Sequence, residues 1–138
     1  MKHFEIVMGL IKQGDSYALQ LRNGKNQAGG LGLIGCFGGQ IEEGETPEEA
    51  LVREVAEESN LSPGIKDLEH LGEVRVESER QDQPITVRSQ IYLIKISPKT
   101  RIHAREGELV TMTEKEVRAN LDKITPATRA CFEQLIKE

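Results

Sequence analysis

Apolar and polar positions along the chain predict several strands separated by turns. Segments that are continuously apolar, or that alternate apolar with polar residues, are typical of strands. We expect strands over residues 4–12, 17–22, 33–37, 68–79, 85–96 and 109–112. Residues 14–16 and 81–84 have the composition of turns, and the polar, glycine-rich residues 23–32 are expected to form a flexible surface loop.

The first of three expected helices begins after Thr46. Thr46 and Glu49 have the spacing of a capping box, and Pro47 suits the first helical position. The helix is expected to end near Ser59, with Asn60 in the left-handed conformation that follows many helices. One continuous helix therefore covers residues 46–59.

Two further helices follow near the end of the chain. A second capping box, Thr113 with Glu116, predicts a helix over residues 113–121, and Thr125 with Pro126 begins the third. Strands that do not alternate regularly with helices favour an α/β sandwich over a doubly wound sheet. A length of 138 residues without repeats or linkers predicts a single domain over residues 1–138.

Negative charge is concentrated in one short segment. The chain has 18 basic and 23 acidic residues, a net charge of −5. Eight glutamates and a single arginine, Arg53, lie between Glu42 and Glu58, so this segment carries −7 and the other residues carry +2. A net negative chain is unsuited to wrapping a long nucleic acid, because that affinity depends on basic side chains. The acidic segment needs a local explanation.

Three of these glutamates share one face of the first expected helix. Glu54, Glu57 and Glu58 are at positions i, i+3 and i+4, so their carboxylates come within about 5–6 Å of one another. Taken alone, such a cluster is more often a solvated acidic face than a metal site. Converging carboxylates are, however, what a hard divalent cation such as Mg²⁺ requires. Gly38 and Gly39 precede the segment, and a glycine-bearing loop before a carboxylate helix favours a platform for a metal-bound phosphate group.

Residues 39–61 resemble the Nudix box, the signature of the Nudix or MutT-type hydrolases. The family pattern is G-x5-E-x7-R-E-U-x-E-E-x-G-U, in which U is a bulky aliphatic residue. The matching residues are Gly39, Glu45, Arg53, Glu54, Val55, Glu57, Glu58 and Leu61. Asn60 replaces the final glycine, and we expect little functional loss because asparagine also tolerates positive φ. The resemblance implies an α/β/α sandwich with a mixed central sheet and a loop–helix catalytic motif.

The resemblance also implies metal-dependent hydrolysis of a nucleoside diphosphate linked to another moiety. The metal ligands, for Mg²⁺ or Mn²⁺, would be Glu54, Glu57, Glu58 and the carbonyl of a glycine near Gly38 or Gly39. Arg53 would orient a carboxylate, and Glu45 would contribute near the junction of loop and helix. Divalent metals neutralise pyrophosphate charge and position an activated water in line with the leaving oxygen.

Residues on both sides of the box are candidates for proton transfer and phosphate binding. Glu54 is one candidate for the general base, and Glu106, in a loop where many relatives supply a glutamate, is the other, with Glu108 second to it. An ordinary charged loop explains residues 103–108 equally well. Arg22, at the end of an expected strand, either binds substrate phosphate or faces solvent.

Missing subgroup signatures narrow the expected substrate. The patterns of ADP-ribose, diadenosine polyphosphate, NADH and coenzyme A hydrolases do not occur at the corresponding positions. The resemblance therefore favours a nucleoside triphosphate, including an oxidised one such as 8-oxo-dGTP. A nucleotide-sugar or ADP-ribose pyrophosphatase is the alternative, and a non-catalytic nucleotide-binding module is less favoured because every metal carboxylate is retained. Relatives are often homodimers.

The remaining sequence features predict a cytoplasmic location without a membrane partner. No apolar run approaches the roughly 18 residues that span a bilayer, and Glu5 interrupts the apolar stretch near the N-terminus. Cys36 and Cys131 lie among apolar neighbours without the paired spacing of a zinc site. We expect both cysteines to be buried and reduced.

Overall fold

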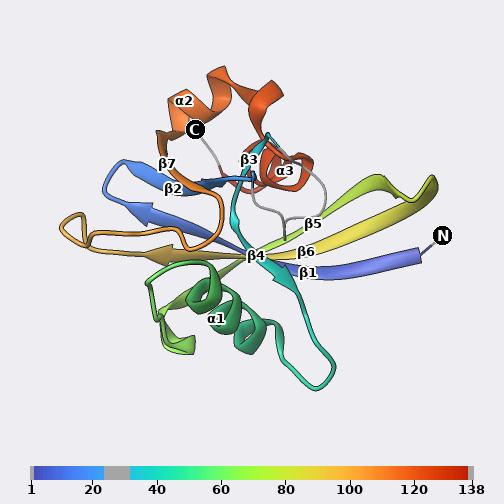
Figure 1. Cartoon of the computed structure of the whole chain (residues 1–138), viewed down its shortest axis with the longest axis horizontal. Helices are drawn as coiled ribbons and strands as arrows, with labels where there is room; N and C mark the ends of the chain where they lie inside the picture. The colour runs from blue at the N-terminus through green and yellow to red at the C-terminus, as the bar shows by residue number, and fades with distance from the viewer. Residues whose placement is uncertain (1, 24–31, 137–138) are drawn as a thin grey trace.

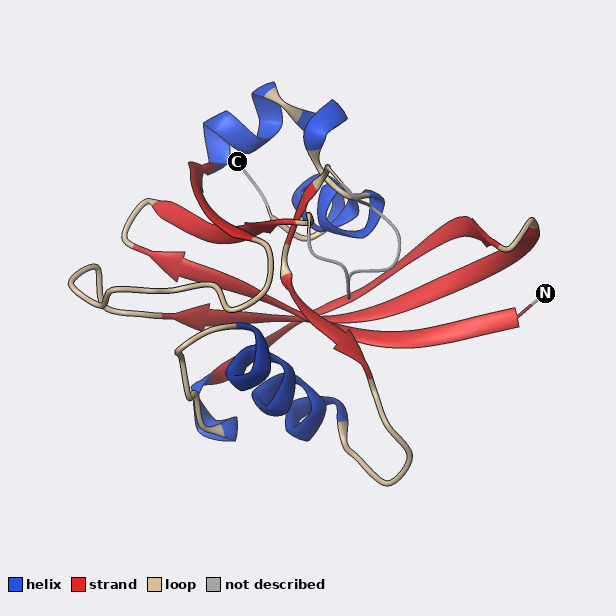
Figure 2. Cartoon of the chain, in the orientation of Figure 1, coloured by secondary structure: helices blue, strands red, loops and turns tan. Residues whose placement is uncertain are grey.

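The fold, described by a computed structural model over residues 2–23 and 32–136, is one sheet with helices on both faces (Figure 1). The strands are β1 (Lys2–Gln13), β2 (Ser16–Leu21), β3 (Ile34–Gly35), β4 (Phe37–Gln40), β5 (Leu68–Arg80), β6 (Gln83–Lys95) and β7 (Glu108–Thr113). The helices are α1 (Pro47–Glu58), α2 (Glu114–Ala119) and α3 (Pro126–Gln134), with single 3₁₀ turns at Ile65–Asp67 and Leu121–Lys123. As Figure 2 shows, α1 covers one face and α2 with α3 covers the other, which confirms the α/β/α sandwich.

The sheet is mixed and is organised around β1. β1 runs parallel to β6 over its whole length, from Lys2 opposite Ile85 to Lys12 opposite Lys95. On its other edge β1 pairs antiparallel with β4 from Ile6 to Gly9 and with β2 from Ile11 to Gln13. β5 forms a hairpin with β6, and β7 pairs with β2, which completes seven strands within the described residues.

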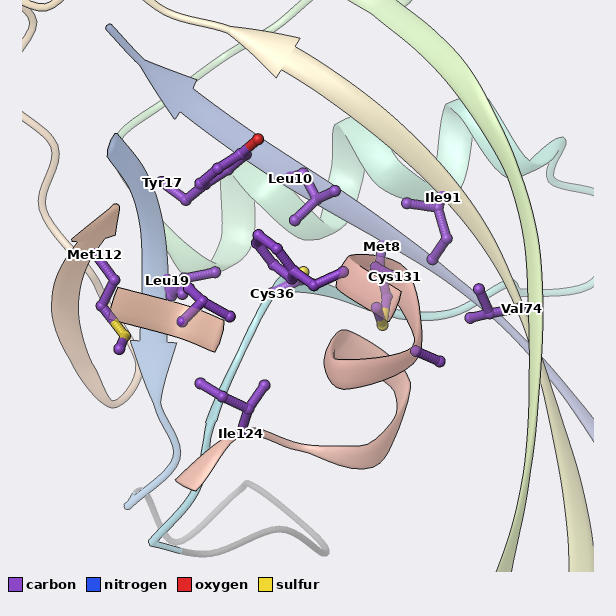
Figure 3. Close-up of a cluster of buried hydrophobic side chains, with 13 residues drawn as sticks. Met8, Leu10, Tyr17, Leu19, Cys36, Val74, Ile91, Met112, Ile124 and Cys131 are labelled. Atoms are coloured by element: carbon purple, nitrogen blue, oxygen red, sulfur yellow. The ribbon is translucent and has the colours of Figure 1, made fainter. Parts of the chain in front are cut away.

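Alternation along β1 divides the core into two clusters. Val7 and Ile11 point to the face that α1 covers, whereas Met8 and Leu10 belong to the cluster under α2 and α3. All four side chains are buried, and the first cluster holds α1 in place. Figure 3 shows the second cluster, in which side chains from β1, β2, β5 and β6 meet those of α3.

Both cysteines lie in the second cluster, as expected from their apolar neighbours (Figure 3). Cys36 and Cys131 are buried and free. The Cys36 N–H donates to the Thr128 hydroxyl (3.0 Å), which ties the sheet to the first turn of α3. No helix within residues 2–23 and 32–136 is long and apolar enough to cross a membrane.

Several element boundaries differ from the sequence-based expectation. Residues 33–37 form two short strands that change partners at Cys36, from β2 to β1. The hairpin turn is shorter than expected because Gln81 and Asp82 both have positive φ (51° and 62°), which suits a two-residue turn. The second helix ends at Ala119 rather than near residue 121. The expected loop over residues 23–32 lies mostly outside the described residues.

The expectation for Asn60 is wrong. Gln81 and Asp82 are the non-glycine residues with positive φ among those described, so Asn60 is not left-handed. The chain leaves α1 extended at Ser59, where φ is −145° and ψ is −177°. Ser59 then forms an antiparallel bridge with Ala104. This tertiary pairing replaces the left-handed helix end.

Candidate active site

The N-terminus of α1 is determined by the residues that predicted it. The Thr46 hydroxyl accepts from the Glu49 N–H (3.1 Å), and the Glu49 carboxylate accepts from the Thr46 N–H (2.9 Å). The buried residues of α1 are Ala50, Leu51, Val55 and Glu58. Because the apolar residues face β1, the helix turns Glu54 and Glu58 toward β4.

Two glycines of β4 let its backbone approach these carboxylates. Gly38 has φ +153°, and a Cβ at this position would collide with the carbonyl oxygen of Val7. A Cβ at Gly39 would lie 2.6 Å from the Glu54 carboxylate. The Gly38 N–H donates to Glu58 Oε1 (2.9 Å). Glycine is therefore required at Gly38 by the neighbouring strand, whereas a Cβ at Gly39 would displace the carboxylate of Glu54.

Glu58 is a buried carboxyl at the centre of the site. Its exposed fraction is 8%, and burial raises its pKa to about 8 although the Gly38 N–H bond acts in the opposite direction. The negative charges of Glu54 and Glu106 raise the pKa of Glu58 further, while Arg22 lowers it. Burial is also the largest cause of the raised pKa of Glu54, which Arg53 opposes. The charges of Glu106 and Arg22 therefore both act on Glu58.

Arg53 connects the loop before α1 to the carboxylates on the helix. Its guanidinium binds Glu45 through two hydrogen bonds, Nε to Oε2 (2.7 Å) and Nη2 to Oε1 (2.9 Å). It also donates to Glu54 Oε1 (2.9 Å) and to the Gln40 carbonyl (3.1 Å). The Arg53 guanidinium lowers the pKa of Glu45 to about 2. Arg53 thus orients Glu54, while Glu45 keeps Arg53 in place.

The third carboxylate of the helix, Glu57, is exposed. Glu57 has a side chain that is 53% exposed and lies 3.4 Å from Arg53 Nη1. Within the described residues, no three acidic, histidine or cysteine side chains are close enough to enclose a metal ion. An exposed ion pair of this kind is weak, so Glu57 is free to turn toward Glu54 and Glu58. The donor set of carboxylate oxygens beside glycine backbone fits a hard divalent cation.

The loop between β6 and β7 brings Glu106 to this site. The Arg105 N–H donates to the Glu58 carbonyl (2.7 Å), and the Glu106 carbonyl accepts from Gln20 Nε2 (2.8 Å). Glu106 is partly buried, whereas Glu108 begins β7 and is exposed. These backbone contacts bring the loop at Glu106 to the end of α1, whereas Glu108 lies in β7.

Two residues at the site were not identified from the sequence. Gln20 alternates with apolar residues in β2, a pattern typical of an exposed side chain, yet it is 1% exposed because the loop that carries Glu106 covers it. Asn60 was treated only as a helix-ending residue, but its side chain binds the same loop. The sequence feature that could have identified Asn60 is that it replaces the glycine of the family pattern.

Comparison with known proteins agrees with the fold and the motif. The family model described as the NUDIX domain matches residues 3–135. No match is found among the curated proteins. The structure is similar to that of a MutT protein from Methanosarcina mazei Go1, with 18% identity, 97% of this chain and 93% of that chain covered, and a TM-score of 0.75.

Two further solved structures have the same fold. A MutT NUDIX hydrolase from Burkholderia pseudomallei has 19% identity, with 99% of this chain and 100% of that chain covered and a TM-score of 0.74. A bifunctional NMN adenylyltransferase/ADP ribose pyrophosphatase from Francisella tularensis, complexed with AMP and a Mn ion, has 15% identity, with 91% of this chain and 38% of that chain covered and a TM-score of 0.66. The chain belongs to the Nudix family of pyrophosphohydrolases, which act on nucleoside diphosphates linked to another moiety.

Proposed function

We propose that this protein is a cytoplasmic, Mg²⁺-dependent hydrolase of nucleoside triphosphates, with oxidised ones such as 8-oxo-dGTP among its substrates. The observation that carries the proposal is the carboxylate pair Glu54 and Glu58, held against the backbone of Gly38 and Gly39. Burying two carboxylates side by side is unfavourable unless a cation compensates them or a proton neutralises one of them, as the raised pKa of Glu58 indicates without metal. A divalent cation bound by both carboxylates would take the place of that proton.

The metal ligands in this proposal are Glu54, Glu57, Glu58 and the carbonyl of Gly38. Oxygen ligands favour Mg²⁺, and Mn²⁺ accepts the same donors. When bound, the metal supplies charge neutralisation for the pyrophosphate and activation of the attacking water. Arg53 keeps Glu54 oriented through its 2.9 Å hydrogen bond.

Residues around the carboxylates complete the proposed mechanism. Arg22 is the proposed partner of a substrate phosphate, and the effect of its positive charge on the pKa of Glu58 supports this role. Glu54 and Glu106 are the two candidates in this proposal for the group that accepts a proton from the attacking water. The backbone contacts of Glu106 and Arg105 hold the loop glutamate beside the metal ligands.

A nucleotide panel with product analysis tests the proposal directly. The panel contains the canonical dNTPs, 8-oxo-dGTP, ADP-ribose and a nucleotide sugar, each with MgCl₂ or MnCl₂. We expect metal-dependent release of phosphate or pyrophosphate from a triphosphate. Preference for ADP-ribose or the nucleotide sugar would replace the substrate assignment, and no turnover of any compound would contradict the proposed activity.

The variant Glu57→Gln provides the matched test of the metal ligands. Its side chain is 53% exposed, so the substitution leaves the fold intact. We expect turnover to fall at least about 100-fold. Loss of a residue that only supports a metal ligand typically costs about 10–100-fold in metal affinity or activity, and Glu57 is itself a proposed ligand. Glu43→Gln, in the exposed loop before α1, removes the same charge and serves as the control. Undiminished turnover by Glu57→Gln would contradict the assignment.

A further inference from the structure

Asn60 binds the loop that carries Glu106 with both ends of its side-chain amide. Nδ2 donates to the Arg101 carbonyl (2.9 Å), and Oδ1 accepts from the His103 N–H (2.8 Å). The Asn60 N–H also donates to the His103 carbonyl (3.2 Å). One side chain thus satisfies two backbone groups of the loop, as a neighbouring strand would.

The same loop is attached to α1 and β2 at three further points. The Arg105 N–H donates to the Glu58 carbonyl (2.7 Å), and Arg105 Nη1 donates to the Ala56 carbonyl (2.9 Å). On the other side of the loop, the Glu106 carbonyl accepts from Gln20 (2.8 Å). Glu106 therefore lies between a contact to α1 and a contact to β2.

Conformation does not explain an asparagine at position 60. The residue lacks positive φ, and the chain is extended at Ser59, so backbone geometry does not require glycine or asparagine here. Glycine would adopt the same backbone but would leave the Arg101 carbonyl and the His103 N–H without this partner. The amide group, rather than the backbone freedom of asparagine, is what the structure uses.

We propose that Asn60 is a positioning residue that holds the loop of residues 101–107 on the end of α1 and so places Glu106 beside the metal carboxylates. This inference rests on the proposed function, because it assigns Glu106 a part in turnover. Gln20 supports Glu106 from β2, while Asn60 fixes the approach of the loop from α1. The interaction needs a side-chain amide, which glycine, the residue of the Nudix pattern at this position, does not have.

Amide hydrogen exchange tests the structural part of the proposal without substrate. In Asn60→Gly we expect the Arg105 amide to exchange about 30-fold faster, which corresponds to about 2 kcal/mol for the two lost hydrogen bonds, because the loop opens more often. The Arg105 amide is diagnostic because its own acceptor, the Glu58 carbonyl, is unchanged by the substitution. Asn60→Asp keeps the acceptor for His103 and is expected to give an intermediate rate.

Asn120→Gly is the matched control. The Asn120 side chain also donates to a backbone carbonyl at the end of a helix, that of Glu116 (2.8 Å), but it lies at the end of α2. Its loss is expected to leave exchange at Arg105 and turnover unchanged. Equal exchange at Arg105 in wild type and Asn60→Gly would overturn the proposal, whatever the enzyme does with nucleotides.

A double-mutant cycle with Glu106→Gln tests whether Asn60 acts through Glu106. With 8-oxo-dGTP as the probe, we expect Asn60→Gly to lower kcat about tenfold in the wild-type background, with a smaller change in KM. In the Glu106→Gln background the same substitution is expected to change kcat less than twofold. If Asn60→Gly lowers kcat by the same factor in both backgrounds, the two residues act independently and the positioning role is overturned. Absence of turnover in the wild type would contradict the proposed substrate alone, and the exchange measurement would still decide the role of Asn60.

Discussion

At the scale of single residues, the site depends on two glycines, whose lack of a side chain leaves room for the carboxylates of α1. Gly38 and Gly39 let the β4 backbone contact two carboxylates, and a Cβ on either one would occupy space already filled. Gly39 lacks positive φ, so alanine is compatible with its backbone and differs only in the added methyl group. This makes Gly39 a clean probe of the Glu54 position.

We expect Gly39→Ala to weaken Mn²⁺ binding about tenfold, because its Cβ would lie 2.6 Å from the Glu54 carboxylate and displace it. Isothermal titration calorimetry with MnCl₂ measures this change. Gly64→Ala is the control, since a Cβ there meets its nearest neighbour, Asp67, at an ordinary 3.5 Å. Equal Mn²⁺ affinity in Gly39→Ala and wild type would show that Glu54 is not a ligand.

The buried Glu58 predicts a pH-dependent stability of the metal-free protein. Burial raises the pKa of Glu58 to about 8, above the value of about 4.3 for an unfolded chain. The stabilisation from its protonated form is therefore complete below pH 4.3 and is lost as the pH rises through 8. We expect the Tm of wild type to fall more steeply than that of Glu58→Gln between pH 5 and 8. Parallel curves in thermal melts with EDTA would contradict this expectation.

At the scale of elements, α1 combines its own start signal with a buried face. The capping box at Thr46 determines where the helix begins, and the buried Leu51 and Val55 determine how it rotates on the sheet. The rotation then points Glu54 and Glu58 at β4. Substitutions that alter the capping box or the buried residues would therefore shift all the candidate ligands on α1 together.

The capping box gives a prediction for the stability of α1. We expect Thr46→Ala to lower the free energy of unfolding by about 1 kcal/mol, because the Glu49 N–H loses its acceptor. Urea denaturation measures this difference. Thr113→Ala removes the equivalent box of α2, an element without candidate ligands, and is expected to reduce stability without changing Mn²⁺ binding. A Thr46 variant as stable as wild type would contradict the prediction.

At the scale of the whole molecule, the hydrophobic core is built from side chains other than the candidate metal ligands. The two hydrophobic clusters enclose β1 from both sides, and the carboxylates lie at the edge of one of them. We expect EDTA-treated protein to remain folded and MgCl₂ to raise its Tm. At 100 times the Kd the gain is about 2.7 kcal/mol in the free energy of unfolding. Differential scanning fluorimetry measures the shift, and an equal rise in Glu57→Gln would show that the effect is not due to this site.

Local patterns were sufficient to predict the elements and the central motif. The capping boxes, the carboxylates of α1 and the burial of both cysteines follow from residues within a few positions of one another, and side chains at i, i+3 and i+4 necessarily share a helix face. The family pattern added Arg53 and Glu45, whose paired hydrogen bonds the structure contains.

Contacts between distant segments were decided only by the tertiary structure. The parallel pairing of β1 with β6 joins residues more than 80 positions apart, and no local signal specifies it. The same packing buried Gln20 under the loop that carries Glu106, and it replaced the expected left-handed end of α1 with an extended Ser59 that pairs with Ala104. The sequence by itself determined which residues form the acidic helix, because helical spacing is local. The tertiary structure decided which loop and strand residues face that helix, because those contacts depend on how the sheet assembles.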